Sequence, residues 1–374
     1  MSGMEELYMW IFKALKPLRF LVVLCILNIV LCFFVVPVNG ASDTMWNQYY
    51  QEEELDTLFV GSSISATTFD PLIFDEILGV KSFNMGTPAQ SILQSIEALE
   101  IAFGEHDVQT VVLSVGFFSL QEEVIDAAEM SFEMGRAKGK GGLAGVCGSA
   151  KWLLSEEVRE TEKSINYFFP WLYNNVAISI DGIRENVLSK LNAVADNTSN
   201  IMPKGYRPYW EEINLDVIWT ENSLYYYSGT TEAQMIAKFE ELMELCNSEG
   251  VDLVVVNTPH PVQDVVACNG IYREMDKLVR ELCSRHGVEY YDFSLAKPEL
   301  FDSKIEYFAD CEHLNHNGAQ AFSKMFCDFL QKRQNGEDIN QYFYTVDEYY
   351  DAHEVLLEEW ITFDLAKEYK RQSE

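Results

Sequence analysis

Short apolar runs alternate with amphipathic stretches along most of the chain beyond residue 50. The runs end in Gly, Asn, Asp or small residues, as buried strands do, and they cover 55–60, 81–84, 110–115, 251–257 and 288–292. Apolar residues recur three and four positions apart, the spacing of a helix, over 90–103, 231–248 and 272–286. Gly250 and Gly287 stand where two of these helices should stop. This alternation predicts an α/β protein in which helices cover both faces of a five-stranded, mostly parallel sheet.

A different pattern occupies the N-terminus. Residues 20–36 carry no charge and are interrupted only by Asn28. At about 1.5 Å per residue such a helix just crosses a hydrocarbon core of roughly 30 Å. Basic residues precede the run and acidic residues follow it, which predicts a single-pass protein of the cell membrane with its N-terminus in the cytoplasm and the rest exported. A cleaved signal peptide is the alternative, since small residues precede Ala41, but the length of the run favours a retained anchor.

The pattern divides the chain into five expected parts. The long middle part is rich in glycine over 138–148 and in aromatic residues, and it exceeds a simple connection, so we expect an inserted subdomain or lid there. Its aromatic side chains, Trp210 above all, fit a core better than a binding platform. In chain order the parts are a cytoplasmic stub with a transmembrane helix (1–40), the first half of the α/β domain (41–120), the insertion (121–230), the second half (231–333) and an acidic extension (334–374).

Charge and cysteine content narrow the class of protein. The formal net charge of −32 excludes a nucleic-acid-binding surface and fits a solvated, exported exterior. Two of the eight cysteines lie in the apolar run, and the other six lack the spacing of a zinc site, so we expect no metal. Those six cysteines are compatible either with disulfides or with buried free thiols.

Two short segments near the ends of the α/β region carry the candidate chemistry. Ser63 follows the first strand in Gly-Ser-Ser, and His313 lies three residues after Asp310, on the same side if that segment forms a helical turn. A serine hydroxyl needs a base to take its proton, and an imidazole works best when a carboxylate fixes its tautomer. Ser62 is the rival nucleophile, and His260 and His316 are rival bases.

Loops at the carboxyl ends of parallel strands meet at one edge of a sheet, so these segments should line one cleft. The second strand runs into Asn84 and then Gly86, where a residue without a side chain lets a backbone N–H approach a developing oxyanion. We therefore expect the oxyanion hole to consist of the N–H groups of Ser63 and Gly86. Further candidate substrate contacts are Ser62, Asn84, Phe118, His260 and Asn315.

These blocks resemble those of the SGNH (GDSL-type) hydrolases, serine esterases and acyltransferases with a flavodoxin-like three-layer α/β/α sandwich. Residues 61–63 resemble the first block, with Ser63 as nucleophile, and 83–86 the second, whose Gly supplies an oxyanion-hole amide. Residues 310–315, followed by Gly-Ala at 318–319, match the last block, which implies His313 as base and Asp310 as its orienting acid. The resemblance covers roughly 55–125 and 231–332, and implies no metal or organic cofactor.

The third block departs from that family, because Phe118 stands where an Asn normally donates to the oxyanion. An N-terminal anchor, a Gly-Ser-Ser block and a missing Asn are together similar to the branch that contains the D-alanyl transfer protein of teichoic acid modification and the SGNH partners of membrane-bound O-acyltransferases. This implies O-acyl transfer or ester hydrolysis on a cell-surface polymer, with a membrane O-acyltransferase as partner. The alternative is a catalytically degenerate domain that binds a glycan or such a partner.

Overall fold

The computed structural model describes residues 3–36, 41–120, 126–155, 158, 164–172, 179–191, 202–213 and 233–359. The chain falls into two compact units. Unit 1 joins Met1–Gly40 with Gly142–Ser199, and unit 2 joins Ala41–Gly141 with Asn200–Glu374. The range 121–230, expected as one insertion, is therefore divided between the two units. The first helix of that range, α6 (Asp126–Gly139), packs closely against α2 (Ala41–Tyr49) within unit 2.

Unit 2 is built on a five-stranded sheet. The strands are β1 (Thr57–Val60), β2 (Ser82–Asn84), β3 (Thr110–Ser114), β4 (Asp252–Asn257) and β5 (Glu289–Asp292). They run in the order β2-β1-β3-β4-β5, and every neighbouring pair is parallel. This is the flavodoxin-like doubly wound order, so the predicted fold class is confirmed. Each observed strand lies within two residues of the predicted run.

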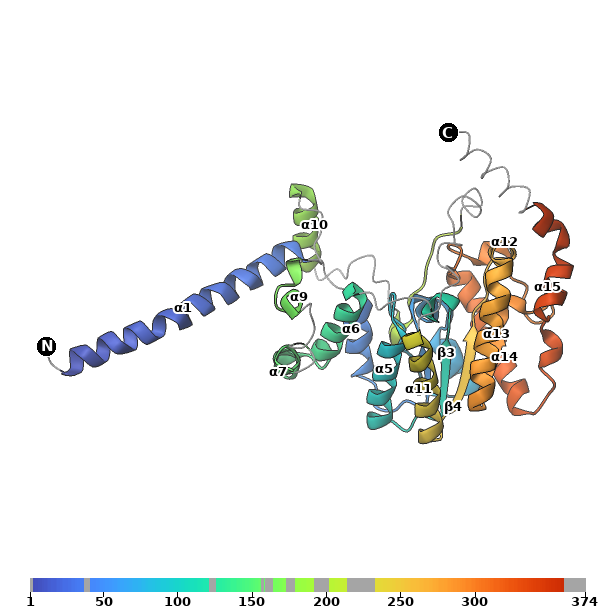
Figure 1. The fold of residues 1–374 in the computed structure, drawn as a ribbon, viewed down its shortest axis with the longest axis horizontal. Helices are drawn as coiled ribbons and strands as arrows, with labels where there is room; N and C mark the ends of the chain where they lie inside the picture. The colour runs from blue at the N-terminus through green and yellow to red at the C-terminus, as the bar shows by residue number, and fades with distance from the viewer. Residues whose placement is uncertain are drawn as a thin grey trace. The chain divides into compact units, whose positions relative to one another are not determined.

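Helices cover both faces of this sheet. In chain order the α-helices of unit 2 are α2 (Ala41–Tyr49), α3 (Ser63–Thr68), α4 (Pro71–Leu78), α5 (Ile92–Glu105), α6 (Asp126–Gly139), α11 (Ala233–Glu249), α12 (Val262–Ala267), α13 (Asn269–His286), α14 (His316–Gln334) and α15 (Val346–Ala352). Its short 3₁₀ helices are η1 (Phe117–Leu120), η3 (Pro203–Gly205), η5 (Phe293–Leu295), η6 (Ile305–Tyr307) and η7 (Asn340–Tyr342). The three helices predicted from periodicity correspond to α5, α11 and α13 (Figure 1). The acidic extension at 334–374 contains η7 and α15 within its described part, and residues 360–374 lie outside that part.

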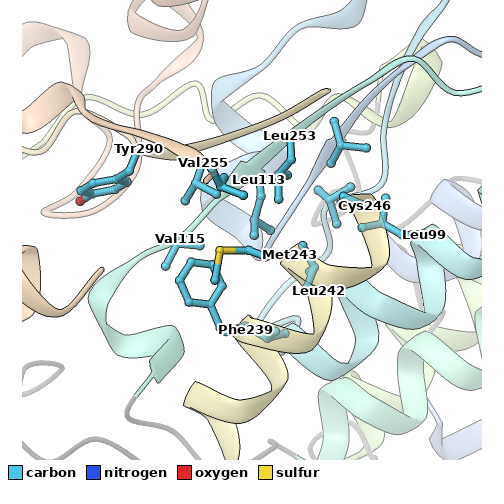
Figure 2. Packing of buried hydrophobic residues seen from close by; sticks show 14 of the residues in the cluster. Leu99, Leu113, Val115, Phe239, Leu242, Met243, Cys246, Leu253, Val255 and Tyr290 are labelled. Carbon is cyan, nitrogen blue, oxygen red and sulfur yellow. The ribbon is translucent and has the colours of Figure 1, made fainter. Parts of the chain in front are cut away.

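Alternation along each strand divides the core into two layers. Successive side chains of a strand point to opposite faces, so Leu113 and Val255 belong to one cluster while Val112 and Val254 belong to the other. Figure 2 shows the first cluster, in which strand residues meet Phe239 and other side chains of α11. Because both faces are buried, the strands read as continuous apolar runs.

Local signals explain where the helices begin and end. Ser91 caps α5, and Gln94 returns a bond to the Ser91 backbone, which together form a capping box. Asp70 caps α4, which starts at Pro71. Gly287 ends α13 in the left-handed conformation, as its position in the sequence suggested.

Unit 1 is helical. It contains α1 (Gly3–Val35), α7 (Gly142–Leu153), α9 (Ser164–Phe168), η2 (Pro170–Leu172) and α10 (Ile180–Leu191). Within α1, Lys16–Val35 has a mean hydropathy of 2.8 and no buried portion. By length and composition this segment is able to cross a membrane, a criterion that a signal sequence also meets.

All eight cysteines lie in described residues, and none of them forms a disulfide. The disulfide alternative is therefore wrong for this structure. Cys246, Cys268, Cys283 and Cys327 are buried, where they pack as small apolar side chains.

A buried carboxyl closes the end of β5. Asp292 is 1% exposed and accepts hydrogen bonds from Tyr272 Oη at 2.6 Å, Asn257 Nδ2 at 3.0 Å and the Ser294 N–H at 3.0 Å. Burial, helped by the nearby charge of Asp276, raises the pKa of Asp292 to about 6, against the bonds that favour the charged form. The folded protein thus holds a proton here that the unfolded chain releases at lower pH.

This raised pKa makes stability depend on pH. Below about pH 4 the carboxyl is protonated in both states, and the native state's extra proton affinity is lost as pH rises through about 6. We expect the free energy of unfolding to fall by on the order of 1–3 kcal/mol across that window. Asp292→Asn should lower stability overall but flatten this dependence, as measured by urea unfolding at several pH values. Asp302→Asn, an exposed control, should keep the slope; equal slopes in all three proteins would contradict the assignment.

Candidate active site

The turn after β1 presents a single accessible residue. Gly61 has φ 142°, and a Cβ there would lie 2.7 Å from the Ser114 carbonyl oxygen, so only glycine fits. Ser62 is buried and caps α3, its Oγ accepting the Ile64 N–H. Ser63 begins α3 and is the one residue between Thr57 and Pro71 that is not buried. The geometry therefore favours Ser63 over Ser62 as the exposed nucleophile.

The imidazole and its acid lie in a tight loop before α14. Asp310 accepts the backbone N–H groups of Glu312 and His313, both at 2.8 Å, and its Oδ2 lies 2.9 Å from His313 Nδ1. The segment is a turn closed by the Asp310 side chain and not a helical turn, which the spacing also allowed. Burial opposes the charged form, but the bonds from His313 and the backbone outweigh it and lower the pKa of Asp310.

Two segments 250 residues apart meet at one hydrogen bond. Ser63 Oγ lies 2.9 Å from His313 Nε2. With Nδ1–H donating to Asp310, Nε2 is left to accept the serine proton. The His313 side chain is 13% exposed and that of Asp310 52% exposed, so solvent reaches the group. The structure thus brings all three predicted catalytic side chains together in the geometry of a serine–histidine–aspartate triad.

The two expected oxyanion donors differ in their surroundings. The Ser63 N–H lies in the first turn of α3, where no intrahelical acceptor exists. Gly86 lies against this turn, since a Cβ there would approach Ala66 N to 2.7 Å and Ser62 O to 2.9 Å. Its N–H, however, donates to Asn84 Oδ1 at 3.0 Å. Gly86 is therefore close to the nucleophile, but its amide already has an acceptor.

Most of the expected substrate contacts hold loops together instead. Asn84 is fully buried and donates to the Ser65 and Phe69 carbonyls, tying β2 to α3. Asn315 is buried and caps α14 through the Gly318 N–H. With Ser62 also buried, we no longer expect these three side chains to touch substrate. The side chain of Phe118 lies outside the described part of the structure.

The rival bases lie away from Ser63. His260 is 2% exposed, and its Nδ1 lies 3.3 Å from Asp264 Oδ2, without hydrogen-bond geometry. Burial favours the neutral ring, yet the neighbouring Asp264 raises the pKa of His260. His316 Nδ1 pairs with Tyr206 Oη at 3.1 Å. Neither ring contacts the candidate nucleophile.

A segment that the sequence did not connect with the site crosses it. Residues 202–213 run over the sheet's carboxyl edge, and this strap is fixed by three backbone bonds: Arg207 N–H to Ala66 O at 2.8 Å, His316 N–H to Tyr209 O at 2.6 Å and Ile213 N–H to Phe308 O at 2.9 Å. The Tyr209 ring meets the His313 ring edge-on at 5.2 Å. Trp210, expected in a core, is 58% exposed and lies against His316, because the strap is extended over the surface.

No group of three or more His, Cys, Asp or Glu side chains suited to a metal ion occurs among the described residues. The candidate chemistry rests on the side chains of Ser63, His313 and Asp310.

The chain is similar to several solved structures at low sequence identity. No family model and no curated protein matches the chain. Among solved structures, it is similar to a Streptococcus pneumoniae protein provisionally described as a platelet activating factor (13% identity, TM-score 0.36, 78% of this chain and 92% of that one). A provisionally assigned acylhydrolase from Bacteroides fragilis (10%, 0.34, 78% and 94%) and a lipase/acylhydrolase from Enterococcus faecalis (12%, 0.34, 75% and 97%) also match.

The strap can be tested at Gly205, which has a positive φ, as does its neighbour Lys204. Gly205 has φ 82°, and a Cβ there would come within 1.9 Å of the Asn84 carbonyl oxygen. Gly205→Ala should lower the free energy of unfolding by at least about 2 kcal/mol and reduce ester hydrolysis, since the same strap holds Tyr209 against His313. Gly104→Ala, on a helix with open space, is the control and should be neutral or slightly stabilising. Equal effects of the two substitutions would show that the strap is not seated this way.

Proposed function

We propose that this chain is a serine esterase or O-acyltransferase of the SGNH type, anchored in the cell membrane and acting outside the cytoplasm. The observation that carries the proposal is the contact of Ser63 Oγ with His313 Nε2, with Asp310 on the other ring nitrogen. These three groups supply a nucleophile, a base and an orienting acid in the order that acyl transfer needs.

The reaction follows from these positions. Ser63 Oγ attacks an acyl carbonyl as His313 Nε2 takes its proton, and Asp310 stabilises the resulting imidazolium. His313 then returns the proton to the departing alcohol, which leaves an acyl group on Ser63. Attack by water on this intermediate gives hydrolysis, whereas attack by a polymer hydroxyl gives transfer. Cell-surface polysaccharide or teichoic acid is the acceptor class that the sequence resemblance favours, with a membrane O-acyltransferase as the expected partner.

The oxyanion hole sets the expected rate. The Ser63 N–H is available, whereas the Gly86 N–H must be shared with or released from Asn84 Oδ1. A missing donor typically costs about 2.7–4 kcal/mol of transition-state stabilisation. We therefore expect slow hydrolysis of simple esters unless the natural substrate or partner supplies another donor.

The hydrogen bond from the Gly86 N–H to Asn84 Oδ1 supports a second candidate function. If the Gly86 N–H stays on Asn84, the domain lacks two of the usual donors and acts as a binding module for a glycan or a membrane O-acyltransferase. Covalent trapping of the serine separates the two functions.

The test uses the full chain in detergent, a fluorophosphonate probe and p-nitrophenyl acetate. Ser63→Ala should abolish both labelling and turnover. Asp310→Asn should lower kcat by up to about 10⁴-fold, because the imidazole loses its tautomer and charge partner. The controls Ser62→Ala and Asp302→Asn should retain activity.

Two results would contradict the assignment. Labelling that survives Ser63→Ala would place the nucleophile elsewhere. A wild-type chain that is folded but neither labels nor turns over ester would favour the binding module.

A further inference from the structure

Unit 1 carries an apolar surface that a water-soluble exterior would not have. Outside α1, thirteen large hydrophobic residues are exposed in the described chain, and nine of them lie between Leu143 and Leu191. Exposed apolar residues are normal when scattered, but concentration in one segment marks a contact surface.

Helix α7 shows this surface most clearly. Leu143 and Val146 of α7, and Leu154 just after its last residue, are 78%, 65% and 70% exposed, and their spacing places them on the same side. Lys151 is the single charged residue of α7, whereas Trp152 on the other side is buried against Tyr167. The helix therefore buries one side around Trp152 and leaves an apolar face exposed.

Residues 168–171, which follow α7 in unit 1, are hydrogen-bonded to the apolar helix α1. Asn28, the one strongly polar residue of the uncharged run, donates through Nδ2 to the Phe168 carbonyl at 2.9 Å. Its Oδ1 accepts the Trp171 Nε1–H at 2.8 Å. A buried polar side chain in an apolar span is costly unless paired, so these bonds make residues 168–171 the partner of α1.

The C-terminal end of α1 is capped by α10. Asn186 Nδ2 donates to the Phe34 and Val36 carbonyls at 2.9 and 3.1 Å, and Lys190 Nζ donates to those of Cys32 and Phe33 at 3.0 and 2.7 Å. A helix end leaves its last carbonyls without intrahelical donors, although the Cys32 carbonyl also accepts the Val36 N–H at 3.1 Å. Figure 1 shows α9 and α10 beside this end of α1. A leader removed after folding would take away the partner of all these groups.

The bonds to Asn28 fix a depth. Asn28 lies seven residues before Val35, the last residue of the apolar span, which corresponds to about 10 Å along the helix. If the span crosses the bilayer, Phe168 and Trp171 lie that far below its outer boundary. The net charge does not oppose this position: residues 142–191 carry five cationic and six anionic residues, a net charge of −1 in a chain of −32. Six of these eleven charges fall in 156–163, so the segments 142–155, 164–172 and 179–191 carry only five.

We propose that the described segments 142–155, 164–172 and 179–191 form a collar around the end of α1 that is embedded in the outer leaflet, with lipid acyl chains covering the exposed face of α7. This rests on the membrane anchor of the proposed function and goes beyond it, because it assigns a second membrane contact to the middle of the chain. It also accounts for the apolar exposure, the paired Asn28 and the near-neutral charge by one location.

A fluorophore on Cys147, which is exposed on α7, tests the location. In a Cys25→Ala, Cys32→Ala, Cys311→Ser background the other four cysteines are buried, so an NBD maleimide should label Cys147 alone. The full chain is reconstituted in vesicles of phosphatidylcholine and phosphatidylglycerol. The matched control moves the label to an exposed site of unit 2 by Cys147→Ser with Ser248→Cys.

We expect doxyl-labelled lipids to quench the label on Cys147, with iodide quenching several-fold weaker than at Ser248→Cys. Equal iodide quenching at the two sites, in chains that float with the vesicles, would overturn the collar and leave the anchor intact. Failure of the full chain to float would overturn both. Shielding of Cys147 in native membranes but not in protein-free vesicles would overturn lipid as the occupant in favour of a membrane protein.

Discussion

The whole candidate site depends on one packing interface, because the contact of Ser63 with His313 exists only while α3 and α14 stay together. Ser323 of α14 binds both ends of the loop after α3, accepting the Asp70 N–H and donating to the Thr68 carbonyl, each at 3.1 Å. Around these bonds Phe69 packs against the Phe322 and Phe326 rings. The nucleophile at the start of α3 and the base just before α14 are therefore positioned by the same buried layer.

Buried amides and carboxyls reinforce this edge of the sheet. Asn84 ties β2 to α3, Asn315 caps α14, and Asp292 joins β5 to α13 through Tyr272. Each satisfies backbone groups that loops at the carboxyl ends of strands would otherwise leave unpaired in the interior. These polar residues look like binding groups in the sequence because they follow strands, but the structure uses them to hold loops in place. The three candidate catalytic side chains, Ser63, His313 and Asp310, remain accessible at this edge.

Much of the fold could be predicted from the sequence, and the reasons are local. Apolar runs with clear ends gave strand positions, and the carboxyl-edge rule for parallel sheets indicated that Ser63, Asp310 and His313 would meet. The turn that Asp310 closes could not be read from spacing, because a carboxylate three residues before a histidine suits a helix as well. Trp210 was misplaced since aromatic content alone does not show whether a segment packs inside or lies extended over a surface. The division of 121–230 between two units depends on long-range contacts that no local pattern records.

In both units, segments far apart in the sequence hold each other in place. In unit 2 a buried layer positions Ser63 and His313, and in unit 1 Asn28 and the end of α1 hydrogen-bond to a segment far along the chain. The proposed chemistry requires Ser63 Oγ to be the reacting atom. A crystal structure of the protein after reaction with an alkyl fluorophosphonate tests it most directly. We predict phosphorus bonded to Ser63 Oγ, a phosphoryl oxygen facing the Ser63 N–H, and His313 still on Asp310. Phosphorus on another residue, or a phosphoryl oxygen with no donor from this turn, would contradict the account.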